Sequence, residues 1–194
     1  INDIQKIGNM LFPNLEGEAP IWQASSRSLW LGIVLYLLET EGLPVTLGEV
    51  LRQVTMGDDY LRDVLTQRLS SDNPLSQECY LALHDYLETP EKTRGSIKKS
   101  FLSALELFYN PVIDTVTSGN DFDLRSIRKK KMSIYVGVSP DDLNRLSPLI
   151  NLFFQQLIDL NTRELPENNK HLKHQVLLLA DQGKRMKLKL DNIL

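Results

Sequence analysis

The sequence contains a single cysteine, Cys79, and this scarcity excludes an internal disulfide framework. It also lacks long hydrophobic runs. The most apolar stretch, residues 29–38, is only about half as long as a bilayer-spanning helix, so we expect it to be a core helix. The first residues carry neither a basic start nor a long apolar stretch, so no signal peptide is visible. The chain opens on Ile1 rather than methionine, and we expect it to be a piece of a longer protein.

Two motifs of enzyme chemistry are missing. No G-x-x-x-x-G-K-[ST] phosphate loop occurs in the chain, and no G-x-S-x-G nucleophile motif occurs either. Covalent catalysis is therefore not supported. The net charge of −3 argues against a protein that is basic throughout, as many nucleic-acid binders are. With 42% hydrophobic and 24% charged residues, the composition is that of an ordinary globular protein.

Helical patterns dominate the first part of the chain. Apolar residues recur there at spacings of three and four, and proline or capping residues separate the segments. We expect residues 1–118 to form an all-alpha domain, with its core at about 15–110. A polar stretch at 118–123 then marks a boundary. The predicted fold class is therefore mainly α.

The pattern becomes α/β beyond that boundary. The apolar, β-rich segments 132–138 and 175–181 predict strands covered on both faces. Between them, Ser147 begins a predicted helix with a wide apolar stripe. Residues 119–194 thus predict a strand–helix–strand crossover. A two-stranded sheet would leave its faces and edges exposed, so we expect the missing strands to come from sequence outside this chain.

Asp181 and Gln182 end the second predicted strand. In phosphate-handling sheet proteins, an aspartate at the carboxyl end of such a strand holds Mg²⁺, and a neighbouring carboxylate can activate water. Gln182 cannot take up a proton. On the motif alone, a strand that merely ends at an acidic residue is the simpler interpretation.

A basic run is the first candidate for contact with nucleic acid. Arg125, Arg128, Lys129 and Lys130 could touch phosphates, although a solvated collar before a buried strand is the interpretation that we favour. His171 and His174 are spaced for a metal but have no third ligand nearby, so we expect no metal site there.

The second candidate for contact with nucleic acid is a helix-turn-helix pattern at residues 46–69. Its second helix sets Asp59 and Asp63 against Arg62 and Arg68, and so brings little net positive charge to a DNA groove. We do not expect it to read DNA.

Two surfaces are candidates for binding a partner protein. One is the polar-aromatic face around Trp22, Arg27 and Trp30. The other is a predicted hairpin from Asp58 to Arg68, which contains Asp59 and Arg62. Most aromatic residues on helices belong to the core, and a few line grooves where a partner docks.

Several segments in order resemble one family. These are "TRGSIKKSF", the long stretch at residues 109–169, and "HQVLLLAD", with weaker likeness in "IQKIGNMLFP" and "WQASSRSLWLGIVLYLLE". Together they resemble the coupling proteins of type IV secretion and conjugation systems. The resemblance covers most of residues 1–181, and a long ordered series of segments is more specific than one short motif.

The resemblance implies a hexameric NTPase, anchored in the bacterial inner membrane through segments that this chain lacks. An all-alpha domain is inserted in its cytoplasmic nucleotide-binding domain and recruits cargo, either protein effectors or a relaxase–DNA complex. Residues 119–194 would be part of that RecA-like nucleotide-binding domain, and residues 175–181 its Walker B strand. ATP and Mg²⁺ would serve the parent protein, whereas the fragment alone would hold no cofactor.

Two departures from the family stand out. Members usually have Asp-Glu-Phe where this chain has Asp181, Gln182 and Gly183. The ending at residues 183–194 does not continue the family pattern. Three functions stay open: a cargo-recruiting domain, a part of the motor that contacts DNA, and an unrelated helical interaction scaffold.

Overall fold

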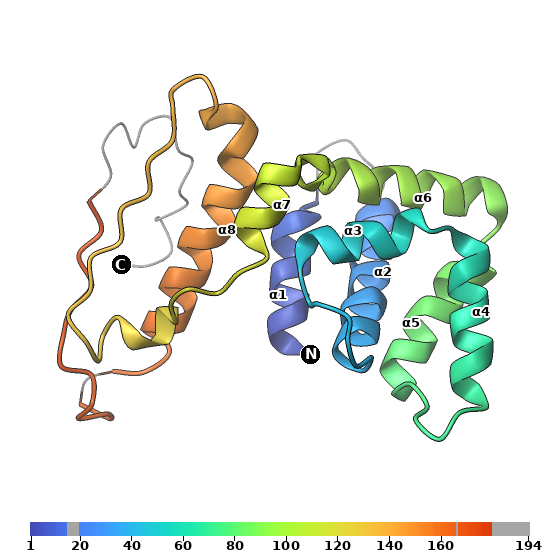
Figure 1. Cartoon of the computed structure of the whole chain (residues 1–194), viewed down its shortest axis with the longest axis horizontal. Coiled ribbons are helices and arrows are strands. Elements are labelled where there is room, and N and C mark those ends of the chain that lie inside the picture. The colour runs from blue at the N-terminus through green and yellow to red at the C-terminus, as the bar shows by residue number, and fades with distance from the viewer. Residues whose placement is uncertain (15–19, 166, 180–194) are drawn as a thin grey trace. The chain divides into compact units, whose positions relative to one another are not determined.

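The computed structural model describes residues 1–14, 20–165 and 167–179. The chain falls into two compact units, Ile1–Gly119 and a second unit that begins at Asn120. Each is considered by itself (Figure 1). The helices of unit 1 are α1 (Asn2–Leu11), α2 (Pro20–Leu38), α3 (Leu47–Thr55), α4 (Asp58–Leu69), α5 (Gln77–Glu88), α6 (Glu91–Ala104), the 3₁₀ helix η1 (Glu106–Tyr109) and α7 (Pro111–Thr117). The prediction of a mainly α fold is confirmed.

Helix α2 is the centre of unit 1. It packs against α1, α3, α5 and α6, and the stripe of Leu29, Ile33 and Leu37 is completely buried. Burying an aliphatic side chain of this size contributes about 1.5–3 kcal/mol. The apolar run at residues 29–38 is therefore a core helix, as its length predicts. Among the described residues, no helix combines the length and the apolarity that crossing a bilayer requires.

Helices α2 and α5 approach each other closely at Gly32. A Cβ atom at this position would lie 2.8 Å from Cδ2 of Leu83, which is closer than packed atoms tolerate. The thiol of Cys79 on α5 lies 3.4 Å from the Gly32 carbonyl oxygen and donates to it. Burial raises the pKa of this thiol to about 12. Cys79 is thus a packing residue that stays protonated at neutral pH.

The starts of α3 and α5 follow local capping. Thr46 followed by Glu49 has the spacing of a capping box, which predicts a helix start here. The side chain of Thr46 accepts a hydrogen bond from the backbone N–H of Glu49, as this pattern predicts. The side chain of Glu49 turns instead to Arg52 and Gln53. The Asn73-Pro74 pair predicts a helix from Leu75, but α5 begins two residues later, at Gln77, with Ser76 as its N-cap.

Helix α6 is shorter than its apolar pattern predicts. The stretch "EKTRGSIKKSFLSALELFY" predicts one helix from Glu91 to Tyr109, but the α-helix ends at Ala104 and is followed by η1. Leu105 is completely buried at this break, so tertiary packing outweighs the helical periodicity. Beyond it, Asp114 on α7 accepts from Arg52 on α3 at 2.7 Å.

Unit 2 contains one long helix. The sequence predicts a short turn and then a new helix at Ser147, whereas the structure has a single helix α8 (Leu143–Thr162) that runs through Pro148. Pro148 cannot donate to the carbonyl of Asn144. The hydroxyl of Ser147 donates to that carbonyl at 3.0 Å, so the helix continues without leaving the oxygen unpaired. A 3₁₀ helix, η2 (Leu124–Ser126), packs on α8.

The two predicted strands are not formed in the part of unit 2 that the structure describes. The prediction that they are covered on both faces is also wrong there, because Tyr135 is 92% exposed, Leu177 80% and Leu179 84%. A strand is stabilised by hydrogen bonds to a neighbouring strand, and segments 132–138 and 175–179 have none. The helix of the expected crossover is present, and the sheet is not seen. That further strands come from outside the chain stays a prediction.

Candidate functional site

The predicted aromatic face on α2 holds α1 in place. Trp30 is 4% exposed, and its indole N–H donates to the carbonyl of Ile4 at 2.8 Å. Arg27 donates to the carbonyl of Phe12 at 2.7 Å. Trp22 is half-buried on the same helix. In this structure Trp30 is inside unit 1 and unavailable to a partner, whereas a role of Trp22 and Arg27 in binding stays a prediction.

The second predicted surface lies on α4. Asp59 is exposed there. Arg62 donates to the carbonyl of Leu87 at 2.7 Å, and its guanidinium lies 3.6 Å from the carboxylate of Glu88. The positive charge of Arg62 therefore serves the C-terminal end of α5. The segment from Asp58 to Arg68 is thus one helix rather than a hairpin. Helices α4 and α5 together form a hairpin, which also carries a hollow that the sequence did not indicate.

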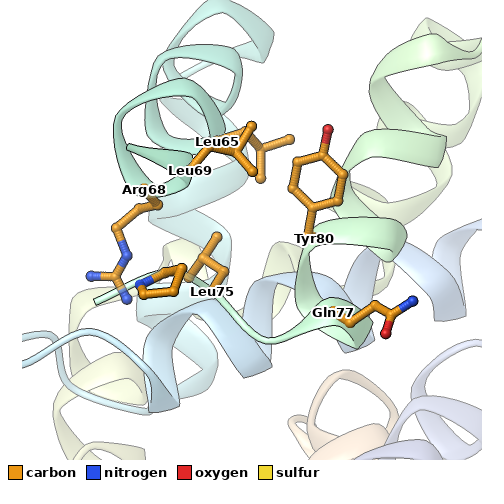
Figure 2. A pocket seen from close by; sticks show the side chains of 7 residues that line it. Leu65, Arg68, Leu69, Leu75, Gln77 and Tyr80 are labelled. Carbon is orange, nitrogen blue, oxygen red and sulfur yellow. The ribbon is translucent and has the colours of Figure 1, made fainter. Parts of the chain in front are cut away.

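This hollow, here called the α4–α5 notch, has a volume of about 240 Å³. Figure 2 shows Leu65 and Leu69 projecting from α4 toward Tyr80 of α5, with Leu75 on the connecting segment. Leu69 is 62% exposed, so part of this apolar surface faces solvent. The remaining wall residues are Arg68, Pro74 and Gln77.

Polar contacts fix the walls of the notch. Arg68 donates to the carbonyl of Glu39 at 2.7 Å. The carboxylate of Glu39 accepts from the backbone N–H of Ser76 at 2.8 Å and from its hydroxyl at 2.6 Å. The end of α2 therefore ties the end of α4 to the start of α5. The Nε atom of Arg68 is buried and has no hydrogen-bond partner among the described residues.

Charge is distributed unevenly along the chain. Unit 1 has 16 Asp and Glu against 9 Lys and Arg, a formal charge of −7, and residues 120–194 carry +4. The α4–α5 hairpin, residues 58–88, holds 7 of these acidic residues and 2 basic ones. Both basic residues, Arg62 and Arg68, donate to backbone carbonyls. The notch thus lies on the most acidic part of an acidic unit.

The predicted basic run of unit 2 divides into structural and exposed residues. Arg128 donates to the carbonyls of Asn161 and Glu164, both at 2.7 Å, and so closes the C-terminal end of α8. Arg125, Lys129 and Lys130 are exposed.

A second basic segment lies beside this run. The backbone N–H of His174 donates to the carbonyl of Arg128 at 3.0 Å, and this bond brings the segment that contains Lys173 beside the segment that contains Lys129. The sequence did not predict this juxtaposition, because about 40 residues separate the two segments.

Unit 2 also has an apolar groove of about 970 Å³. The segments 132–138 and 174–179 line it together with Ile150, Phe153 and Leu157 of α8. The apolar stripe predicted for this helix is therefore real, but the described residues leave it only partly covered.

The predicted catalytic pair, Asp181 and Gln182, lies outside the described residues. Its role in holding Mg²⁺ stays a prediction. No three His, Cys, Asp or Glu side chains are grouped to hold a metal ion within the described ranges.

Comparison with known proteins gives one family. Residues 1–186 match the family model described as Type IV secretory system Conjugative DNA transfer. Conjugal transfer protein TraG of Escherichia coli is 26% identical over 198 aligned positions, which cover 94% of this chain and 31% of TraG. Protein VirD4 is 44% identical in Rhizobium radiobacter and 38% in Agrobacterium fabrum, each over 82 residues, 42% of this chain and 12% of VirD4. The chain spans less than a third of the length of these relatives.

Proposed function

The chain belongs to the coupling-protein family of type IV secretion and conjugative DNA transfer, and from this premise we propose that unit 1 recruits protein cargo. The cargo is a secreted effector or a relaxase, recognised through its signal domain and passed to other components of the secretion channel. The observation that carries the proposal is the α4–α5 hairpin, which has an open, mainly apolar hollow and carries 7 acidic residues against 2 basic ones. Such a combination suits recognition of a protein surface.

The whole protein, on this proposal, is an NTP-driven motor. It works as a homohexamer at the cytoplasmic side of the inner membrane and uses ATP and Mg²⁺. Asp181 would be the Mg²⁺-facing residue of its Walker B strand, and Gln182 would impair turnover more than nucleotide binding. The 194 residues contain no phosphate loop, so we expect no tight Mg²⁺-dependent binding of nucleotide by this chain.

The test of recruitment is direct binding. Relaxases and effectors encoded beside the gene would be purified and titrated calorimetrically against the 194-residue chain. We expect micromolar binding that is lost when the C-terminal signal domain of the cargo is removed. Cargo that is captured by the full-length protein but not by this chain would refute the assignment of recruitment to unit 1.

A second candidate function is contact with DNA through unit 2. It is favoured by the hydrogen bond that joins the segment of Lys173 to that of Lys129 and Lys130, because lysines that neutralise phosphates release the counterions condensed on DNA. The measurement is fluorescence anisotropy with single- and double-stranded DNA at about 50–250 mM NaCl.

Substitutions separate a specific DNA contact from general charge. Replacing Lys129 and Lys130 by alanine should lower the slope of log K against log salt by roughly 2. Lys92→Ala, an exposed lysine of unit 1, should leave the slope unchanged. A flat salt response of the wild-type chain would eliminate this candidate.

A further inference from the structure

We propose that the α4–α5 notch is the seat of one apolar side chain from a basic, amphipathic segment of the cargo. This inference rests on the proposed recruiting function and adds where the cargo docks and what chemistry its docking segment has. The residues that form the seat are Leu65, Leu69, Leu75 and Tyr80.

The size of the notch selects the kind of occupant. Pockets for small molecules measure about 300–1,000 Å³ and bury most of the ligand. At about 240 Å³ and open to solvent, the notch holds less than a small ligand requires and is matched to one large side chain. Interfaces between proteins commonly use such an anchor in a pocket. Leu69 is exposed at the rim, and its burial when the anchor enters contributes favourably to the free energy of binding.

The charge around the notch selects the sign of the charge on the partner segment. Asp72 lies in the segment between α4 and α5, and Glu78 lies in the first turn of α5 beside Gln77 of the notch. Both are exposed. Arg68 is the one charged residue that lines the notch, but the hairpin that carries it has 7 acidic residues against 2 basic ones, so the net charge around the notch is negative. Lysine and arginine side chains that flank the anchor therefore complement this surface.

The notch is also held in shape before the cargo arrives. Arg68, Glu39 and Ser76 link three helix ends through hydrogen bonds of 2.6–2.8 Å. A pocket whose walls are fixed loses less conformational entropy on binding. The anchor therefore meets a surface that needs little rearrangement.

The first test uses two labelled amphipathic peptides with leucines at helical spacing. One carries lysine at its charged positions, and its twin carries glutamate. Anisotropy titration with the 194-residue chain should give about tenfold weaker binding for the glutamate twin. Leu69→Ala should weaken binding of the lysine peptide by about fivefold or more. The matched control is Leu81→Ala, a leucine of α5 that is 53% exposed and does not line the notch, and it should change binding less than twofold.

The rim is tested by Asp72→Asn combined with Glu78→Gln, with Glu106→Gln as the exposed control. The double variant should show a weaker dependence of binding on salt than the wild type, and the control should not. Circular dichroism melts would establish that each variant is folded. Equal binding of both peptides, or equal effects of Leu69→Ala and Leu81→Ala, would overturn the inference.

Failure of this inference differs from failure of the proposed function. If cargo binds wild type and Leu69→Ala equally well, unit 1 still recruits cargo, and the notch is not its seat. If no cargo binds the chain at all, recruitment itself is refuted. Loss of cargo binding in Leu69→Ala with retention in Leu81→Ala would support both.

Discussion

Replacing Arg94 by methionine tests what holds the α4–α5 hairpin in place. Arg94 lies on α6, and its side chain is only 15% exposed. Its Nε donates to the carboxylate of Asp58 at 2.6 Å, and its Nη1 donates to the carbonyls of Leu87 and Thr89 at 2.8 and 2.9 Å. One guanidinium thus joins the start of α4 to the end of α5. Methionine keeps an unbranched apolar stem and removes all three bonds.

The expected loss of stability can be worked out from these bonds. A hydrogen bond to a charged group contributes about 1.5–3 kcal/mol, and leaving a buried carbonyl unpaired costs about 1–3 kcal/mol. Arg62 still donates to the carbonyl of Leu87 at 2.7 Å in the variant, so only the carbonyl of Thr89 carries this second cost. Lys98 and Tyr86 still contact Asp58 in the variant, at 3.4 and 3.2 Å, so the sum is an upper bound. We expect a loss of about 2–4 kcal/mol and a fall of about 10 °C in the melting temperature of unit 1.

The pH dependence separates the ion pair from the carbonyl bonds. Burial alone would raise the pKa of Asp58, but the hydrogen bond from Arg94 and the charge of Lys98 outweigh it, and the pKa lies below its usual value. A lowered folded-state pKa contributes stability above the unfolded pKa of about 3.9, and that stability is lost as the pH falls through the folded value. The difference between wild type and Arg94→Met should therefore shrink below about pH 4 without vanishing.

The assay is thermal unfolding followed by circular dichroism between about pH 3 and pH 7. Lys99→Met is the matched control, because Lys99 is an exposed cation on the same helix, and it should change the melting temperature by no more than about 2 °C. A change in Arg94→Met as small as that of the control would refute the assigned role of Arg94. A difference between variant and wild type that stays constant with pH would refute the contribution of the ion pair.

Three further outcomes are expected. Cys79 should not react with Ellman's reagent at pH 8 in the native chain and should react fully in guanidinium, since its thiol is buried with a pKa of about 12; rapid native labelling would contradict this. Gly32→Ala should destabilise unit 1 by about 1–3 kcal/mol in thermal melts because of the tight contact with α5, whereas Gly95→Ala, in open space within α6, should be neutral or stabilising by up to about 1 kcal/mol. Arg128→Met should speed amide hydrogen exchange in the last turn of α8, and Lys129→Met should not; equal rates in both variants would argue against the capping role.

The hairpin connects these stability predictions to the proposed function. The notch lies where α4 turns into α5, and Arg68 and Arg94 hold the two ends of this hairpin. We therefore expect Arg94→Met to weaken binding of the lysine peptide as well, because a loosened hairpin holds the walls of the notch less firmly. Binding that is unchanged below the melting temperature of the variant would show that the seat does not depend on Arg94.

The sequence by itself determined which segments of unit 1 are helical, although the end of α6 at Ala104 was decided by packing. Their starts and ends depend on neighbours in the chain, as in the Thr46 cap, and on apolar spacing, as along α2. The ordered segments that resemble coupling proteins also indicated the family, which the comparisons confirm. These features are local or collinear, so they can be derived from one chain without coordinates.

Only the tertiary structure decided which side chains are exposed and so available to a binding partner. Trp30 and Leu69 are both apolar residues on helices, and nothing in the sequence distinguishes the buried one from the exposed one. Three arginines each donate to a backbone carbonyl of an element distant in the sequence: Arg62, Arg68 and Arg128. Their guanidinium groups are therefore engaged within the fold, whereas Lys129 and Lys130 are exposed. Segments 132–138 and 175–179 have the composition of strands, but a strand forms only where a neighbour supplies N–H and C=O groups. Exposure and pairing are properties of contacts between distant parts of the chain, and for that reason the notch and the basic juxtaposition emerged only from the fold.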